Sequence, residues 1–473
     1  MGEIDEKEKM REKEASLERQ KQEEKYLKMT TTPVEKLICG LAGPTIISML
    51  VTSFYNMADT FFVGKIGTSA TGAVGIVFSV MAIIQAFGFF FGHGSGNYVS
   101  RKLGEQDFEE ASRMAATGFV SAFLAGLVIM AAGLIFLEPL CHILGATPTI
   151  LPHAKAYLGI ILIGAPYMTA ALVLNNQLRF QGSAFYGMIG ITSGAVLNIV
   201  LDPVFIYIFH MGVAGAALAT IISQFVSFLL LLKGTRSGGN LRIELRKFSP
   251  SIRRYQIILN GGTPSLCRQG LASVATTCMN LMARPFGDAA IASMSIVMRI
   301  TNFAASIMIG FGQGFQPVCG FNYGAKKYGR VQRGFWFCVK MSTIFLLAMA
   351  VLGWFGAGLL VSLFQKNDAQ VIAYGTRALR FQCLTFPLLG WITMCNMMMQ
   401  TIGKGVRASI LAMSRQGLFI IPLVIILSAK MGFLGIQISQ PISDCISFLV
   451  AIALQASVLR EMNLQVKEQQ AEG

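Results

Sequence analysis

The sequence predicts an all-α integral membrane protein whose 12 transmembrane helices form two six-helix bundles. Three observations favour this fold. Hydrophobic residues make up 53% of the 473-residue chain, and charged residues only 13%. The apolar segments exceed the roughly 20 residues that a helix needs to cross the hydrocarbon core of a bilayer. The second half of the chain also repeats the first half at a constant offset of 220 residues.

The repeat is visible in glycines, prolines and other residues that keep one spacing in both halves. A gap-free offset of this kind indicates two copies of one structural unit. An even number of spans per copy returns the chain to its starting side, so both copies enter the membrane in the same direction. We therefore expect a pseudo-two-fold axis along the membrane normal. The matching residues include Pro44 and Pro264, Gly67 and Gly287, Gly94 and Gly314, Gly104 and Gly324, Arg113 and Arg333, and Gly215 and Gly435.

The predicted spans follow one another with short connections. The N-terminal six-helix lobe, 31–234, contains spans at 36–63, 71–96, 112–138, 153–178, 186–210 and 212–234. The C-terminal six-helix lobe, 255–458, contains spans at 255–283, 289–317, 332–358, 373–400, 406–429 and 432–458. Residues 235–254, rich in Gly, Ser and charge, are the predicted linker loop between the lobes, and residues 459–473 form a C-terminal tail.

The N-terminal tail, 1–30, differs from the rest of the chain. Its first 28 residues carry eight basic and nine acidic side chains. Spacings such as Glu3 to Lys7 suit a solvated helix or a disordered tail, and we expect no catalytic role for it. A cleavable signal peptide is excluded, because such a signal has no acidic stretch before its apolar region.

The basic residues of the short loops predict the orientation. With the N-terminus in the cytoplasm, the cytoplasmic connections hold 17 Lys and Arg residues and the outer connections 5. Because cytoplasmic loops carry the excess of positive charge, we expect both termini in the cytoplasm and the protein in the plasma (inner) membrane. The net charge of +15 is scattered over these loops, so it does not predict nucleic-acid binding.

Several classes of chemistry find no support in the sequence. The nine cysteines lie mostly inside the spans without CxxC pairing, which favours reduced thiols packed in the core. The four histidines are too scattered to build a metal site. No GxxxxGK[ST] motif for ATP is present. We therefore expect neither an enzyme nor a cofactor-dependent protein.

Polar side chains inside the spans are the informative residues, since burial in the membrane carries a cost that a partner or a function must offset. Asp59, Asp202 and Thr220 all fall in the outer half of the N-terminal lobe. Asn198 lies four residues before Asp202 and shares its helix face. Pro203 cannot donate to the carbonyl of residue 199, which leaves another oxygen free beside Asp202. Together these groups predict a hard-oxygen site for a proton or a sodium ion.

The two halves differ at these positions. Met279 occupies the repeat position of Asp59, and Pro422 occupies that of Asp202, so only the first copy carries the acids. An alternative interpretation makes Asp202 a neutral packing residue and Asp59 a water-exposed residue at the end of its helix.

The same reasoning gives candidate substrate contacts, because long amides rarely face lipid. We expect Tyr55, Asn56, Asn175 and Asn176 among the few polar groups of an otherwise apolar, aromatic central cavity. Asp444 lies in the last span, where it can pair with a basic residue. No role is assigned to Asp444 or to the basic residues within the predicted spans, which are Arg268, Arg299, Lys340, Arg377, Arg380 and Arg415.

Two stretches carry a family resemblance. The run 316–325, QPVCGFNYGA, follows the eighth span, and Asn56-Met57-Ala58-Asp59 precedes Val63-Gly64 in the first. With these motifs the chain resembles the multidrug and toxic compound extrusion (MATE) transporters over roughly 30–460. Asp59, Asn198, Asp202 and Thr220 match the cation site of the DinF-like branch, which lies in the N-terminal lobe. The NorM-like branch couples through acids in the seventh and tenth helices, and neither 255–283 nor 373–400 contains Asp or Glu.

The resemblance implies a V-shaped pair of bundles, alternating access, and export of organic cations or amphipathic compounds driven by inward proton or sodium flow. It also implies a monomer that meets only its substrate and membrane lipids. Two alternatives stay open. A lipid or lipid-linked oligosaccharide flippase of the same superfamily would use the basic residues within 268–415, and a facilitator would transport without ion coupling.

Overall fold

The computed structural model describes residues 2–365 and 368–472, with the side chains of 2–15, 56, 60, 68 and 470–472 outside that description. The first lobe contains α2 (Val34–Gly64), α3 (Thr68–Gly104), α4 (Phe108–Ile135), the short α5 (Leu137–Ile143), α6 (Leu151–Phe180), α7 (Ala184–Pro203) with the π-helix η1 (Val204–Ile208), and α8 (Gly212–Gly234). A linker with the 3₁₀ turn η2 (Leu245–Lys247) follows.

The second lobe begins with α9 (Ile252–Ala283) and the turn η3 (Arg284–Phe286). It continues with α10 (Asp288–Gly324), α11 (Tyr328–Phe364), α12 (Ala369–Thr401), α13 (Gly405–Met413), the π-helix η4 (Ser414–Leu418), α14 (Ile420–Met431) and α15 (Phe433–Glu472). Helix α1 (Gly2–Thr31) precedes both lobes. Each predicted span therefore corresponds to one long helix, except that 186–210 ends in the π-helix η1 and 406–429 comprises α13, η4 and α14. The all-α fold with two six-helix bundles is confirmed.

The hydropathy of the helices agrees with this topology, with one instructive exception. Among the described residues, 11 spans are long and apolar enough to cross a membrane. The remaining one, α9, has the required length but is less hydrophobic, because polar residues such as Arg268, Gln269 and Asn280 are spread along it. All nine cysteines are free thiols; five are buried, whereas Cys39 and Cys445 are exposed, so the prediction of core packing holds only in part.

Backbone conformation repeats between the lobes as the sequence does. Gly67 and Gly287 both have positive φ (151° and 88°) just before α3 and α10. Gly212 and Gly432 have φ of 57° and 62°. Gln106 and Lys326 are non-glycine residues with φ of 62° and 58°, an uncommon left-handed conformation. Because the same rare conformations recur 220 positions apart, the two halves are copies of the same structural unit.

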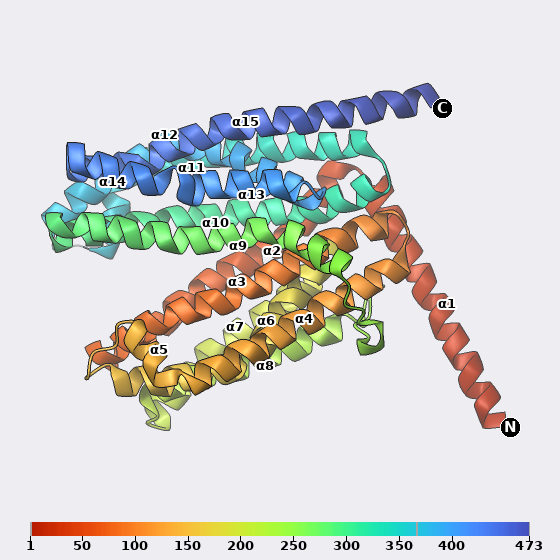
Figure 1. Cartoon of the computed structure of the whole chain (residues 1–473), viewed down its shortest axis with the longest axis horizontal. Helices are drawn as coiled ribbons and strands as arrows, with labels where there is room; N and C mark the ends of the chain where they lie inside the picture. Colours follow the sequence, from red (N-terminus) through yellow and green to blue (C-terminus); the bar gives the residue numbers. More distant parts are fainter. Residues whose placement is uncertain (1, 366–367, 473) are drawn as a thin grey trace.

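The two lobes converge on the side where both termini lie, here called the terminal side, and diverge on the opposite side (Figure 1). On the terminal side α2 packs against α10 and α3 packs against α9. Glycine permits backbone contact at this junction. A Cβ added at Gly104 would lie 2.1 Å from the carbonyl oxygen of Phe321, and one added at Gly324 would lie 2.0 Å from that of Arg101. These two contacts are exchanged by the repeat offset, as a two-fold axis between the lobes requires.

Polar contacts reinforce the junction. Arg254 at the start of α9 donates from Nε and Nη2 to the two carboxylate oxygens of Glu110 on α4, at 3.1 and 2.7 Å. Arg101 on α3 donates to the backbone carbonyl of Thr401 on α12. The terminal side is therefore closed by direct contact between the lobes.

Candidate functional site

The candidate site is built around α7, where the helix changes geometry. Asn198 and Asp202 lie on the buried face of α7, with exposed fractions of 1% and 0%. Pro203 cannot donate a hydrogen bond, and the π-helix η1 begins directly after it. A π-turn widens the helix and often occurs at functional sites. The altered helix geometry lies on the C-terminal side of Asp202, and a free carbonyl of residue 199 beside Asp202 stays a prediction.

The Asn198 amide connects α7 to α8. With its nitrogen facing the carboxylate, it donates to Asp202 Oδ2 at 3.0 Å, and its oxygen accepts from the backbone N–H of Thr220 at 3.2 Å. Thr220 is 1% exposed. The other carboxylate oxygen, Asp202 Oδ1, is buried and has no hydrogen-bond partner among the described residues. The structure therefore brings Asn198, Asp202 and Thr220 together around an incompletely satisfied carboxylate.

Helix α2 contributes the second acid and a tyrosine. Oδ1 of Asp59 is buried without a hydrogen-bond partner in the part of the chain that the structure describes. The carboxylates of Asp59 and Asp202 interact electrostatically with each other. One turn before Asp59, the Tyr55 hydroxyl interacts with Thr220 and Gln224 on α8 and with both acids. The site therefore joins α2, α7 and α8.

Tyr157 on α6 completes the site and was not predicted from the sequence. Its ring is fully buried, and its hydroxyl finds no hydrogen-bond partner among the described residues. It interacts with Asp59, Asp202, Tyr55 and Thr220. The one signal in the sequence is a tyrosine near the outer end of an otherwise apolar span. Tyrosines are common at membrane interfaces, which makes that signal weak.

The electrostatic character of this cluster is unusual for a membrane interior. No basic side chain of the described residues contributes to the surroundings of Asp59 or Asp202. A buried carboxylate is costly unless it is paired, hydrogen-bonded or neutralised. Two such groups with two unpartnered oxygens, an amide and hydroxyls form a donor set suited to a proton or a small hard cation.

The predicted substrate contacts are not gathered in one place. Asn175 and Asn176 are 18 and 19 residues beyond Tyr157 on α6, a separation of about 27 Å along the helix. Asn175 packs against Gly187, and Asn176 donates to the carbonyl of Leu172 and accepts from Arg179. The structure places these two amides in helix contacts near the terminal side, and their role as substrate contacts stays a prediction. Tyr55 belongs to the acid cluster, and the side chain of Asn56 lies outside the described residues.

The second lobe carries different chemistry at the repeat positions. Met279 is 5% exposed within the hydrophobic core. Asp444, at the repeat position of Gln224, is fully buried and forms an ion pair with Arg415 at 2.9 Å, the kind of pairing expected from the sequence. Gln382 and Gln440 donate to the same carboxylate, each at 3.0 Å. This acid has a cationic partner and a full set of donors, whereas the acids of the first lobe have neither.

This contrast predicts a structural role for Asp444. Replacing it by Ala leaves Arg415 partly buried without a counter-ion, and breaking such a pair typically costs about 3–5 kcal/mol. We expect a clear drop in the thermal unfolding temperature of the purified protein, measured by intrinsic fluorescence in detergent. The double variant Asp444→Leu with Arg415→Met should recover much of that loss. An unchanged unfolding temperature in Asp444→Ala would contradict the structural role.

The other basic residues of the spans have simpler surroundings. Arg299, Lys340, Arg377 and Arg380 are exposed on the surface of the lobe, and Arg380 stacks 5.9 Å from the ring centre of Trp354. Long basic side chains can place their charged ends at the membrane interface. Arg268 is partly buried and interacts electrostatically with Arg415.

Comparison with known proteins identifies the family to which this architecture belongs. The MatE family model matches residues 44–204 and 264–426, and the two stretches begin at the repeat-related Pro44 and Pro264. This chain belongs to the MatE family. Membership identifies this MatE protein as a multi-pass membrane transporter of small molecules rather than an enzyme.

Individual relatives agree over almost the full length. The multidrug export protein MepA of Staphylococcus haemolyticus is 28% identical over 431 residues, covering 91% of this chain and 95% of its own. Among solved structures, MATE in complex with MaL6 gives a TM-score of 0.87 at 27% identity, covering 92% of this MatE protein and 99% of that chain. An outward-facing multidrug resistance MATE transporter of the MOP superfamily gives a TM-score of 0.85 at 28% identity, with 92% and 99% covered.

Proposed function

We propose that this MatE protein exports organic cations or other amphipathic compounds by antiport against protons or sodium ions. The relatives named as multidrug export proteins support the direction and the substrate class. The observation that carries the coupling proposal is the acid cluster: two carboxylates with unpartnered buried oxygens and no basic neighbour among the described residues. Such a site accepts a cation as its missing partner.

The proposed cycle follows from the missing counter-charge of the two carboxylates. A ligand shifts the equilibrium between two conformations only through its different affinities for them. The cluster spans α2, α6, α7 and α8, so a proton or sodium ion that neutralises it changes how these four helices pack. The cation binds while the divergent side is open, and the rearranged first lobe then favours release of the exported compound.

The orientation of the molecule completes the proposal. The excess of Lys and Arg in the connections near the termini favours a cytoplasmic terminal side. In that orientation the lobes, which diverge on the side opposite the termini (Figure 1), open towards the outside, as in an outward-facing state. The acid cluster then lies in the outer half of the first lobe, where external cations reach it.

The experiment is transport of a fluorescent organic cation by purified protein in liposomes, with a proton gradient and a sodium gradient applied separately. We expect the dye to accumulate under one of the two gradients. When neither gradient is applied, only leakage is expected. Accumulation that is independent of both gradients would overturn the coupling proposal and favour a facilitator. Scrambling of a labelled lipid without dye transport would favour the flippase alternative.

The site also predicts a graded effect at Tyr157. Tyr157→Phe keeps the buried ring but removes a hydroxyl that faces both acids, so the cation loses one polar ligand. We expect the concentration of the coupling cation needed for half-maximal transport to rise by about tenfold, the usual effect of one hydrogen bond of roughly 1–1.5 kcal/mol. Tyr167→Phe serves as the control, because its hydroxyl donates to the carbonyl of Ile221 away from the acids. Equal cation dependence of the two variants would contradict a ligand role for Tyr157.

A further inference from the structure

Helix α1 is attached firmly to the second lobe by its last turn. Asn322 on α10 donates to the carbonyl of Met29 at 3.1 Å, and Lys327 donates to that of Thr30, also at 3.1 Å. Arg330 on α11 donates to the carbonyl of Thr32. Cationic donors at a helix C-terminus satisfy its free carbonyls and complement its dipole. The Met29 side chain is 2% exposed in the core that joins the lobes.

One turn earlier, the same helix is attached to the first lobe. Lys25 donates to Ser183 Oγ, in the connection between α6 and α7, at 2.8 Å. It also donates to Asn240 Oδ1 at the start of the linker. Asn240 in turn donates to the carbonyls of Gly234 and Ser237, which fixes this part of the linker on α8. Two turns of α1 thus bridge the lobes across the terminal side.

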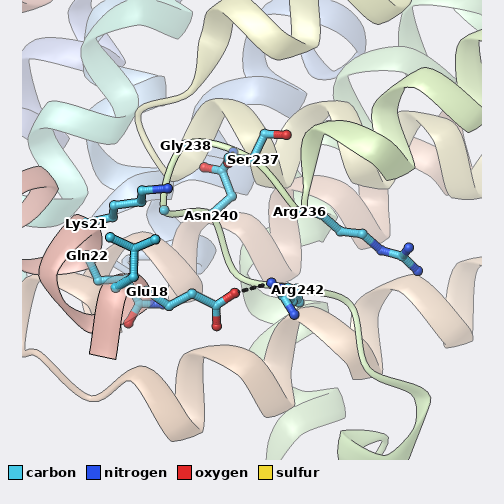
Figure 2. Close-up of a pocket in the computed structure, with 10 residues that line it drawn as sticks. Glu18, Lys21, Gln22, Arg236, Ser237, Gly238, Asn240 and Arg242 are labelled. Carbon is cyan, nitrogen blue, oxygen red and sulfur yellow. Dashed lines mark hydrogen bonds and ion pairs between the residues drawn. The ribbon is translucent and has the colours of Figure 1, made fainter. Parts of the chain in front are cut away.

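The attachment to the first lobe is the weaker of the two. A cavity of about 410 Å³ lies between α1 and the linker. Figure 2 shows that polar groups line it, with Glu18 directed towards Arg242 and Lys21 towards Asn240. In the ion pair of Glu18 and Arg242 both side chains are more than a third exposed. Such exposed pairs contribute little to stability. This contact is polar and partly exposed apart from Met29, which also packs against Gly182 of the first lobe, whereas the contact with the second lobe caps the helix end.

We propose that α1 is a clasp between the lobes, which holds the terminal side closed and detaches from Ser183 and Asn240 when that side opens. The proposal rests on the alternating access of the proposed function, because only opening of the terminal side separates Ser183 from Asn322. The clasp remains on the second lobe throughout and engages the first lobe in the closed state. It therefore favours the conformation in Figure 1.

The chemistry of Lys25 adds a pH dependence to the clasp. Burial, with a smaller effect of Lys28, lowers the pKa of Lys25 from 10.5 to about 7 in the docked state. The neutral Ser183 and Asn240 accept from it, and no carboxylate among the described residues pairs with it. The charged groups around this contact are Glu18 and Lys21 on α1, Arg236 and Arg242 on the linker, and Lys327 and Arg330 of the second lobe.

The sign of the effect follows from linkage. Between about pH 7 and 10.5 the docked clasp binds fewer protons than the detached one, so docking strengthens as pH rises through this window. Below pH 7 both states are protonated and the penalty stays constant.

The first test measures distances between spin labels at Arg113 on α4 and Val406 on α13, both exposed on the terminal side, after Cys39 and Cys445 are replaced by Ser. At pH 10, where most of the penalty for burying a protonated Lys25 is absent, Lys25→Ala should raise the ratio of open to closed populations by roughly tenfold, as expected for loss of two hydrogen bonds. Lys28→Ala, an exposed residue on the same helix, is the matched control. Raising the pH from 7 to 9 should increase the closed population of the unsubstituted chain but not of Lys25→Ala. Identical populations in Lys25→Ala and Lys28→Ala would overturn the proposal.

A second test does not depend on how a substitution changes the stability of the protein, because the same molecules are compared with the cross-link attached and cleaved. Cysteines introduced at Lys25 and Ser183, with Cys39 and Cys445 replaced by Ser, are joined by a short bis-methanethiosulfonate, which forms a reducible disulfide with each thiol and releases sulfinate. We expect transport to stop when the linker is attached and to return when it is cleaved. A linked pair at Thr32 and Arg330, within the attachment to the second lobe that is proposed to persist, should stay active. Full transport by the linked Lys25–Ser183 protein would show that the clasp does not open, and would overturn the proposal even though antiport itself continued.

Discussion

Replacing Asp202 by Asn is expected to reduce gradient-driven efflux by about 100-fold, at the upper end of usual coupling free energies. The substitution keeps the size and the hydrogen-bonding capacity of the side chain but removes the ionisable group. Asp202 is fully buried and linked to Thr220 through Asn198, so the substituted amide stays in the cluster without an ionisable group. The measurement is dye efflux from energised liposomes, with protein amount and substrate binding determined in parallel.

The controls separate coupling from folding. Asp59→Asn should weaken or abolish efflux by the same reasoning. Met279→Ala, at the repeat position of Asp59, should lower stability without changing the proton or sodium dependence, because Met279 is a core residue of the second lobe. Full gradient-driven transport by Asp202→Asn would make Asp202 a packing residue, the alternative that the sequence also allows.

A methyl group at Gly104 should open the terminal side. The added Cβ would lie 2.1 Å from the Phe321 carbonyl oxygen, a backbone atom that cannot rotate away. Overpacking of this kind costs about 1–3 kcal/mol, and the strain exists only while the lobes are in contact. We expect Gly104→Ala to shift the population towards the open terminal side by roughly 5- to 150-fold and to slow transport strongly.

The spin labels at Arg113 and Val406 measure this shift. Gly324→Ala should reproduce it, because Gly324 meets the Arg101 carbonyl in the repeat-related contact. Gly75→Ala on the same helix as Gly104 is the control, since an added Cβ there meets nothing within 4 Å. Unchanged label distances in Gly104→Ala would mean that the junction accommodates the methyl group by a local shift. That result would contradict a rigid contact between the lobes.

The fold was predictable because its two signals are local in the sequence. Span length and the constant offset from Gly67 to Gly287 require no knowledge of packing, and both copies indeed share these backbone conformations. Helix α9 shows the limit of hydropathy. Polar residues along it lower the apolar signal, although its length and its repeat relation to α2 still indicate a span.

The candidate site was only partly predictable. Asn198 and Asp202 share a helix face by their spacing, and the structure does bring them to Thr220. Tyr157 and Gln224 were missed because membership of the cluster depends on which helix faces which, and that is set by tertiary packing. For the same reason the sequence grouped Asn175 and Asn176 with Tyr55 in one predicted cavity. A sequence shows that an amide lies in a span but does not show which residues lie beside it. The bridging role of α1 likewise arises from contacts with residues far along the chain.

The most direct test of the account runs the coupling in reverse. Protein in liposomes is given a substrate gradient and no ion gradient, and the movement of protons and of sodium ions is recorded separately. Because coupling between two ligands is reciprocal, substrate flux should drive one of these cations in the opposite direction, and Asp202→Asn should abolish that movement. Substrate flux without movement of either cation, in a protein that transports at full rate, would contradict antiport through the acid cluster.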